Sequence, residues 1–418
     1  MTRRHVFQSA AATARHDAPR ENAAPVVAAP RARVESVDAL RGIIMMVMAL
    51  DHVRDYFGDL SASPTNLATA STGLFLTRWV THICAPVFFL MAGTGAYLAL
   101  RRRSTSELSR FLVTRGLWLV VLEIVVLRFA MQFNVDYQVT LLTVLWALGW
   151  SMVVLGALVH LPTRLVAAFG IVLILVHNLL DGINAGTLGA LGPLWSVLHA
   201  PGFLLNTPDH VVFVAYPLVP WIGVTAAGYG LGQLYDLGAE RRRVMLAWLG
   251  VGMIAAFIIL RAMNGYGDPS RWSAQESPLR TLLSFINTTK YPPSLLFLLM
   301  TLGPALLLLR ALDGQRTIPP WLQPAVIIGR VPMFFFLLHF VLIHLLAVAA
   351  SAVRLGDASG MFQSASLDKF PITQPPGWPM GLPAVYMIWT AVVVLMYRPC
   401  RWFAEVRRRR TDWWLSYL

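Results

Sequence analysis

Residues 332–353 read PMFFFLLHFVLIHLLAVAASAV, an apolar run that contains no charged side chain. A helix needs about 20 apolar residues to cross the hydrocarbon core of a bilayer, so this run is long enough to span a membrane. Similar runs recur along the whole 418-residue chain, which is 56% hydrophobic and 13% charged and has a mean hydropathy of +0.60. Soluble domains average about 25% charged residues. We therefore predict an all-α, polytopic helical membrane bundle.

The apolar runs predict about ten transmembrane helices in one domain over residues 35–403. The expected spans are 39–57, 77–100, 109–129, 139–160, 163–180, 211–235, 244–263, 293–312, 326–353 and 382–402. The segment 185–205 contains prolines and several glycines and is predicted to be re-entrant or interfacial. Residues 1–34 lack a long apolar run, so we expect a disordered cytoplasmic tail there and not a signal peptide. Residues 404–418 are predicted to be a basic, amphipathic cytoplasmic tail.

The arginines lie in short blocks between the apolar runs. With ten spans, every arginine-rich connection falls on the same side as both termini, and the opposite loops are longer and poorer in Lys and Arg. By the positive-inside rule we expect both termini in the cytoplasm, and a cell inner membrane location if the chain is bacterial. The net charge of +13 is then a topology signal and does not indicate nucleic acid. Cys84 and Cys400 fall near opposite membrane faces, so no disulfide is expected.

Ionisable residues within the first span demand an explanation, because each costs about 2.5–3.5 kcal/mol at a helix centre on insertion scales. Arg41 lies near the cytoplasmic mouth, and His52 follows about 16 Å further along a helix. Asp51 precedes His52, and Asp55 follows it by three positions, so Asp55 can share its helical face. A carboxylate beside an imidazole raises its basicity, as a general base requires. The alternative is that these residues are only the wet end of a helix.

Further histidines occupy other spans. His82 opens the second span, and Arg330, His339 and His344 lie along the ninth. A lone histidine in an apolar helix is usually satisfied by a neighbouring helix, but His52, His82 and His344 all fall at outer helix ends and are expected to converge on one cavity. Zinc could bind such a set, yet no HxxH or HExxH spacing supports it, so no metal is predicted.

Several motifs point to a known family. The stretch SVDALRG (36–42), continuing to Asp51-His52, resembles the heparan-alpha-glucosaminide N-acetyltransferase catalytic-domain family, whose bacterial members were long described as a domain of unknown function. Arg41 and His52 are also similar to the first-span Arg and catalytic His of the acyltransferase-3 family. Four further segments resemble the N-acetyltransferase family. These segments are THICAPVFFLMAG (81–93), YPLVPWIG (216–223), GRVP (329–332) leading to His339, and WWLSYL (413–418). The resemblance covers nearly everything after residue 34.

The resemblance implies an acyltransferase that uses acyl-CoA, with acetyl-CoA expected as its co-substrate. The eukaryotic family members have their presumed catalytic His in the loop after the first of these spans. Loop 58–81 contains no histidine here, so the role passes to His52 or to His82. In this interpretation His52 is the base, Asp51 or Asp55 orients it, and His82 or another outer polar group stabilises the oxyanion. His339 and His344 are assigned to the acceptor or to support of the catalytic groups.

The donor and the acceptor are expected at opposite ends of the bundle. Arg41 and Arg330 would hold the CoA phosphates at the cytoplasmic mouth, and an amine or hydroxyl of a sugar or glycan would accept the acyl group on the far side. The expected partners are the lipid bilayer, acyl-CoA and this acceptor, but no nucleic acid, and a homo-oligomer remains an open alternative to a monomer. The competing hypotheses are a proton-coupled transporter of a small molecule or lipid-linked sugar and a structural membrane protein.

Overall fold

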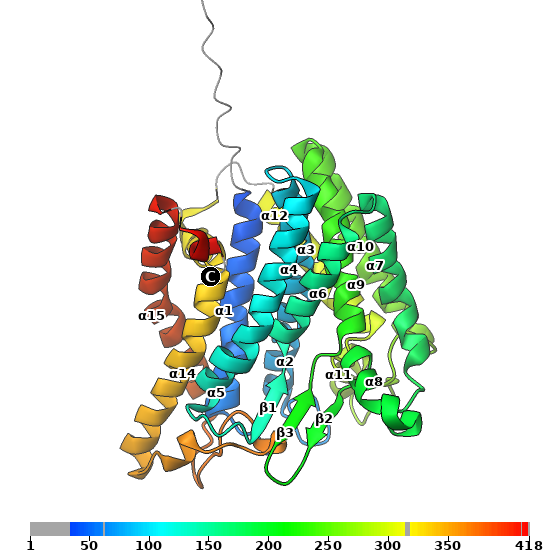
Figure 1. The fold of residues 1–418 in the computed structure, drawn as a ribbon. Helices are drawn as coiled ribbons and strands as arrows, with labels where there is room; N and C mark the ends of the chain where they lie inside the picture. Colours follow the sequence, from blue (N-terminus) through cyan, green and yellow to red (C-terminus); the bar gives the residue numbers. More distant parts are fainter. Residues whose placement is uncertain (1–33, 62, 314–317, 411, 417–418) are drawn as a thin grey trace, which may run out of the picture. The chain divides into compact units, whose positions relative to one another are not determined.

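The structure, a computed structural model, describes residues 34–61, 63–313, 318–410 and 412–416. Apart from residue 34, the predicted N-terminal tail lies outside these described residues. The α-helices in Figure 1 are α1 (Glu35–Phe57), α2 (Thr72–Thr81), α3 (Cys84–Leu100), α4 (Thr105–Val121), α5 (Arg128–Gln132), α6 (Val144–Leu158), α7 (Thr163–Val176), α8 (Gly192–Leu198), α9 (Leu218–Leu231), α10 (Ala239–Met263), α11 (Pro278–Ile286), α12 (Leu295–Asp313), α13 (Gln323–Arg330), α14 (Pro332–Leu355) and α15 (Leu382–Arg409).

Shorter elements complete the chain. A π-helical turn, η1 (Leu122–Leu127), joins α4 to α5, and the 3-10 turns are η2 (His177–Leu180), η3 (Ala185–Leu191), η4 (Gly232–Asp236), η5 (Pro320–Leu322), η6 (Ser359–Phe362), η7 (Leu367–Lys369) and η8 (Trp413–Ser416). The strands are β1 (Val139–Leu142), β2 (Gly202–Asn206) and β3 (Val211–Val214).

The predicted all-α membrane bundle is confirmed. Each of the ten expected spans overlaps at least one helix, and six helical segments of the described chain are long and apolar enough to cross a membrane. They are Thr72–Leu100, Thr163–Leu180, Ala239–Met263, Leu295–Asp313, Pro332–Leu355 and Leu382–Arg409. The total number of crossings stays a prediction. The segment 185–205 forms only the short elements η3, α8 and most of β2, which are too short to span a bilayer.

The helices differ in how much of their apolar surface the protein covers. The most apolar window of α12 is 67% buried inside the protein, whereas the corresponding windows of α7 and α10 are only 17% buried. Both helices therefore present large exposed apolar side chains, among them Ile171, Val172, Leu175, Trp248, Val251, Ile258 and Ile259. A surface this apolar is stable against lipid tails and not against water, so α7 and α10 face the bilayer.

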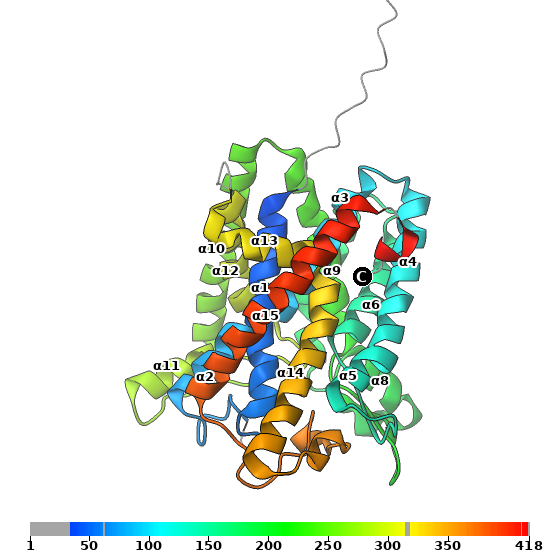
Figure 2. The same cartoon turned by 90° about the vertical axis from the view of Figure 1, so that its left-hand side faces the viewer.

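Helix α1 lies among the other helices and contacts α3, α12, α13, α14 and α15 (Figure 2). Its tightest neighbour is the short helix α13. A Cβ atom on Gly42 of α1 would overlap the carbonyl oxygen of Ala325, and one on Gly329 of α13 would overlap the carbonyl oxygen of Asp38. The absence of side chains at these two glycines lets the helix backbones touch, as small residues do in membrane bundles.

One end of the bundle, which we call the arginine end, gathers the arginine-rich segments. Asp313 at the end of α12 accepts from Ser36 Oγ at 3.1 Å and pairs with Arg242 of α10 at 2.8 Å. Arg330 pairs with Glu35 at 3.0 Å, and its carbonyl oxygen accepts a hydrogen bond from Arg407 of α15 at 2.8 Å. The starts of α1 and α10 and the ends of α12, α13 and α15 therefore share one end of the bundle, at the top of Figure 1.

The opposite end carries a three-stranded sheet in the order β1-β3-β2, and we call it the sheet end. Strand β1 pairs parallel with β3, so that Val139 aligns with Val211, and β2 pairs antiparallel with β3. Residues 139–142 and 211–214 were expected to begin transmembrane helices, and that expectation was wrong. A short apolar run suits a buried strand as well as a helix, and Val and Thr favour the strand.

Candidate active site

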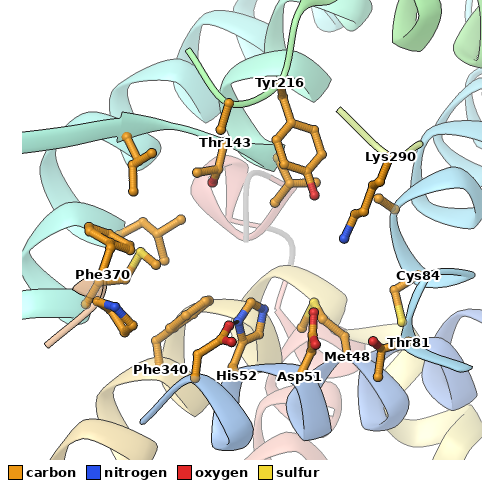
Figure 3. Close-up of a pocket in the computed structure, with 18 of the residues that line it drawn as sticks. Met48, Asp51, His52, Thr81, Cys84, Thr143, Tyr216, Lys290, Phe340 and Phe370 are labelled. Carbon is orange, nitrogen blue, oxygen red and sulfur yellow. Dashed lines mark ion pairs between the residues drawn. The ribbon is translucent and has the colours of Figure 1, made fainter. Parts of the chain in front are cut away.

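A cavity of about 660 Å³ opens among α1, α2, α3, α14 and the sheet-end segments. Pockets for small ligands commonly measure about 300–1,000 Å³, so a sugar-sized molecule fits this one. Figure 3 shows Asp51 and His52 pointing into the cavity from α1, with Tyr216, Thr143 and Lys290 on the facing walls. Both carboxylates of the predicted site, Asp51 and Asp55, line it beside His52.

His52 is held on the cavity wall by aromatic contacts. Its ring lies 4.2 Å from the ring centre of Phe340 and 5.3 Å from that of His339, both on α14. The His52 side chain keeps 22% of its surface exposed, and Asp55 Oδ2 lies 3.9 Å from its Nδ1 atom. That distance suits an ion pair once the ring is protonated but exceeds a hydrogen bond. Asp55 is therefore the carboxylate placed to stabilise a protonated His52.

Asp51 belongs to a group of paired charges. Its carboxylate is paired with Arg78 of α2 and lies 3.0 Å from Arg54, and Arg54 also donates to Asp55 at 2.6 Å. These four charged side chains, which we call the charged cluster, join α2 to the last turns of α1. The two guanidinium groups occupy Asp51, so this residue anchors the cluster and does not contact the His52 ring through a hydrogen bond.

The facing wall supplies a third cation. Lys290, which precedes α12, points into the cavity next to Tyr291 and Tyr216. With Arg54 and Arg78 against Asp51 and Asp55, the ionised lining carries one net positive charge. Partial burial would raise the pKa of the Tyr291 phenol, but the cations of Lys290 and Arg78 outweigh it and hold that pKa below its ordinary value. The cavity is therefore electrostatically suited to developing negative charge on a ligand.

Thr143 is fixed by a carboxylate buried in the bundle. Glu123 on η1 accepts hydrogen bonds from the Thr143 hydroxyl at 2.5 Å, from its amide at 2.8 Å, and from the amides of Leu145 and Trp146 at 2.9 and 3.3 Å. A carboxylate at a helix N-terminus satisfies amides that lack a helical partner. Glu123 thereby anchors the start of α6 where it meets the cavity.

The three outer histidines do not converge on one cavity. His82 is buried against Phe297 and lines a separate, smaller pocket of about 370 Å³ that shares Arg54, Arg78, Lys290 and Tyr291 with the main cavity. The ring nitrogens of His344 lie 3.2 and 2.8 Å from the carbonyl oxygens of Ala130 and Met361, away from the cavity lining. A neutral imidazole carries one N–H, so His344 donates a hydrogen bond to one of these two carbonyls. A backbone group is therefore its partner, as is usual for a histidine in an apolar helix.

His339 stands behind His52. It is fully buried, and its Nδ1–H donates to the Phe335 carbonyl at 3.0 Å. This bond sets the tautomer, so Nε2 keeps its lone pair, and this atom has no hydrogen-bond partner among the described residues. Since His339 contacts His52 and not the cavity, it is placed to position the His52 ring.

Arg41 and Arg330 both lie at the arginine end, beside Asp38. Arg41 lies 3.4 Å from Asp38, and Arg330 lies 4.0 Å from the same carboxylate and 3.0 Å from Glu35. Their side chains are 21% and 35% exposed, so solvent reaches both. The two arginines thus form a cationic pair bridged by acidic groups, and neither contributes to the lining of the main cavity.

Sequence reasoning missed part of this site. Lys290 and Tyr291 lie in a polar loop, where charged and aromatic residues are common and carry no signal. Glu123 could have been found, because an acid in the middle of the apolar run 109–129 requires an internal partner. Cys84 lines the cavity, but its thiol donates to the Ile44 carbonyl at 3.6 Å, which suits a packing role.

Comparison with known proteins identifies one family. Residues 33–262, more than half of the chain, match the family model described as heparan-alpha-glucosaminide N-acetyltransferase, catalytic. The matched range contains Arg41, Asp51, His52, Asp55 and His82 and ends before Lys290 and Arg330. No curated protein matches the chain.

Proposed function

This chain belongs to the heparan-alpha-glucosaminide N-acetyltransferase catalytic family and is therefore a membrane acetyltransferase. We propose that it takes an acetyl group from cytosolic acetyl-CoA and transfers it to an amine or hydroxyl of a sugar or glycan at the other membrane face. The observation that carries the proposal is the cavity of about 660 Å³ with His52 on its wall. An imidazole in contact with a sugar-sized cavity can remove a proton from a bound acceptor.

The acetyl group passes directly from CoA to the acceptor in this mechanism. His52 takes the proton of the acceptor amine or hydroxyl as the acceptor attacks the thioester carbonyl. A C–N or C–O bond forms, the C–S bond breaks, and the proton passes from His52 to the departing CoA thiolate. Asp55, 3.9 Å from His52 Nδ1, stabilises the imidazolium that exists between the two proton transfers.

Negative charge develops on the carbonyl oxygen during this transfer. His82 was the first expectation for its stabilisation, but it lines the neighbouring pocket. Lys290 points into the main cavity opposite His52, and we assign the role to its ammonium group. A fixed cation in a site of low dielectric constant is an effective oxyanion stabiliser.

The donor is proposed to enter from the arginine end. Arg41 and Arg330 lie there and are both partly exposed, which suits binding of CoA phosphates. Arg41 precedes His52 by eleven positions on α1, about 16 Å at 1.5 Å per residue. The thioester-bearing arm of CoA is slender and would extend along α1 toward His52.

The arginine end is proposed to be cytoplasmic, with both termini on that side, and the membrane to be the inner membrane if the chain is bacterial. The ion pairs that join α1 to α13 and α10 to α12, and the hydrogen bond from α15 to α13, support a single positive face. By the positive-inside rule, this face does not cross the membrane. The sheet end and the cavity then face the compartment of the acceptor.

Thermal unfolding of the detergent-purified chain with and without acetyl-CoA tests the donor. Ligand at 100 times its dissociation constant stabilises a folded protein by about 2.7 kcal/mol. We expect acetyl-CoA to raise the unfolding temperature of wild type, His52→Ala and the control Arg164→Ala, whose arginine is exposed at the start of α7, but not of Arg41→Ala. If acetyl-CoA stabilises none of these proteins, the proposed donor is wrong, and a pH-gradient-driven transport assay becomes the next experiment.

A further inference from the structure

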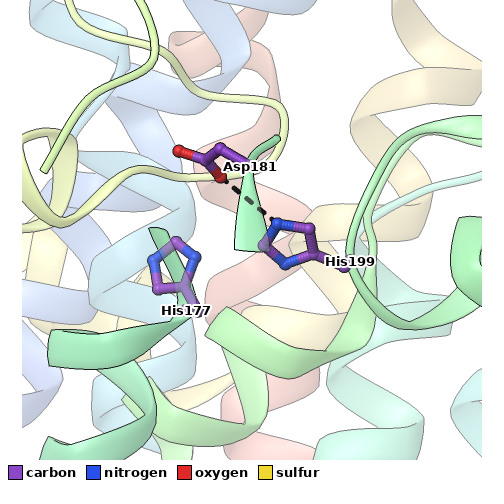
Figure 4. A group of neighbouring side chains, drawn as sticks. All are labelled: His177, Asp181 and His199. Atoms are coloured by element: carbon purple, nitrogen blue, oxygen red, sulfur yellow. Dashed lines mark hydrogen bonds and ion pairs between the residues drawn. The ribbon is translucent and has the colours of Figure 1, made fainter. Parts of the chain in front are cut away.

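Three metal-ligating side chains gather outside the active-site cavity. His177 on η2, Asp181 just after η2 and His199 at the end of α8 place one ligand atom each within 4.8 Å of one another. Figure 4 shows the three side chains turned toward a common point. Both histidines are almost fully buried, at 1% and 2% exposure, and Asp181 is half-buried.

His177 cannot be explained by packing alone. Neither of its ring nitrogens has a hydrogen-bond partner among the described residues. Native proteins pair nearly all buried polar atoms with a protein group, a water or an ion. A buried imidazole that points at a carboxylate and a second imidazole has the surroundings of a metal ligand.

The carboxylate is oriented by residues outside the group. Asn178 Nδ2 donates to Asp181 Oδ2 at 2.8 Å, and Asn178 Oδ1 accepts from the Leu295 amide at 2.8 Å. These two hydrogen bonds leave Asp181 Oδ1 directed at His199 Nε2, 3.2 Å away. Bonds of about 2.0–2.1 Å to a tetrahedral zinc ion separate two ligands by about 3.3 Å. The Asp181–His199 pair has nearly that spacing. The hydrogen bond from Asn178 holds the Asp181 carboxylate in this orientation, as groups behind metal ligands commonly do.

We propose that His177, Asp181 and His199 bind one Zn²⁺ ion. Two imidazoles and one carboxylate form a known set of zinc ligands, and three protein ligands leave the fourth tetrahedral position to a water molecule. In the bound form the ion takes the place of the proton that His199 Nε2 otherwise shares with Asp181. Each histidine binds as the neutral ring.

The ion would brace one wall of the active-site cavity. It joins the end of α7 to the segment that contains η3, α8 and β2, and Pro201, two residues after His199, lines the cavity. Asn178 extends the connection to the first turn of α12. The ion would therefore hold the segment 181–206 against the end of α7 at the sheet end.

The three proposed zinc ligands have a spacing in the sequence that differs from the common zinc motifs. His177 and Asp181 are four positions apart, and His199 follows Asp181 by 18 positions. Zinc motifs of the HxxH and HExxH types do not include this spacing, and the expectation of no metal rested on those motifs alone.

Zinc binding by the full chain, purified without a polyhistidine tag, tests the proposal. The protein is stripped with EDTA and titrated with Zn²⁺, and bound zinc is measured by elemental analysis and by competition with a chromogenic chelator. We expect about one zinc per chain in wild type and in the controls His160→Gln, an exposed histidine, and His52→Gln, in the cavity. His177→Gln should lose the ion, and Asn178→Ala, which keeps all three ligands, should weaken zinc affinity about 10- to 100-fold.

Hydrogen exchange supplies a second measurement that does not depend on activity. Added Zn²⁺ should slow amide exchange within 181–206 in wild type and leave α4 unchanged, and it should have no effect on His177→Gln. Equal zinc affinity in wild type and His177→Gln would overturn the proposal. So would loss of the ion in His52→Gln, because that result places the zinc in the cavity.

Discussion

His52 differs in its surroundings from the two histidines of α14. His344 is tied to two backbone carbonyls, and His339 donates to the carbonyl one turn earlier, whereas His52 borders open cavity volume. We expect His52→Ala to lower kcat for acetyl transfer by about 10²- to 10⁴-fold, the usual contribution of a general base. The measurement is transfer of radiolabelled acetyl from acetyl-CoA to a panel of amino sugars and glycans.

The control for this substitution is His344→Gln. It removes a buried ring outside the cavity, so it should lower the unfolding temperature while leaving kcat within a few-fold of wild type. A loss of kcat in His344→Gln equal to that in His52→Ala would contradict the assignment of His52 as the base.

The charged cluster makes a prediction about stability. Removing one partner of a buried ion pair costs about 3–5 kcal/mol because the other charge stays unpaired. Arg78 and Asp51 are each only 12% exposed, so we expect Arg78→Gln to destabilise the folded protein by an amount near that range. In Asp51→Asn the same Arg78→Gln change should cost much less. Unfolding in mixed micelles of all four combinations gives the coupling energy, and additive effects would refute the pairing.

Individual residues differed in how far the sequence could predict them. The sequence singled out four residues of the first span, because ionisable side chains within an apolar span are costly and usually have a function. They are Arg41, Asp51, His52 and Asp55. Lys290 did not stand out, because it is one cation in a polar loop and only the fold carries it to the cavity. The grouping of the outer histidines was wrong because helix depth alone does not say which way a side chain points.

At the scale of elements, the contact between α1 and α13 makes the sharpest prediction. A side chain on Gly42 would collide with the Ala325 backbone, which cannot move aside without shifting α13. Overpacking typically costs about 1–3 kcal/mol, and we expect Gly42→Ala to lower stability within that range. Gly252→Ala on α10 is the matched control, since nothing lies within 4 Å of its added Cβ. That change should be neutral or stabilising by up to about 1 kcal/mol.

The same scale shows where pattern reading fails. Helices α7, α10, α12, α14 and α15 follow from apolar runs of spanning length. The strands β1 and β3 were included in predicted spans, because a short and mostly apolar strand next to an apolar helix extends the pattern of that helix without a break. Pairing between residues 139–142 and 211–214 is a long-range event that no local pattern records.

For the whole molecule, the proposed orientation can be tested by thiol labelling. Both natural cysteines are buried, and replacing them by alanine gives a background for single new thiols. Glu240→Cys at the start of α10 and Asp209→Cys between β2 and β3 place exposed thiols at opposite ends. In right-side-out vesicles a membrane-impermeant maleimide should label Asp209→Cys at once and Glu240→Cys only after permeabilisation. The reverse pattern would invert the topology and separate the arginine end from cytosolic donor.

The charged cluster also has a consequence for biosynthesis. Helix α1 is not among the six strongly apolar helical segments, because Arg41, Asp51, Arg54 and Asp55 interrupt it. Its buried partner Arg78 belongs to α2, which leaves the ribosome later. A nascent chain that ends before α2 exposes Asp51 to lipid with Arg54 as its nearest cation. We therefore expect the translocon to retain α1 until α2 and α3 emerge and to release the three together, so that the helices that carry the proposed catalytic residues enter the membrane as one unit.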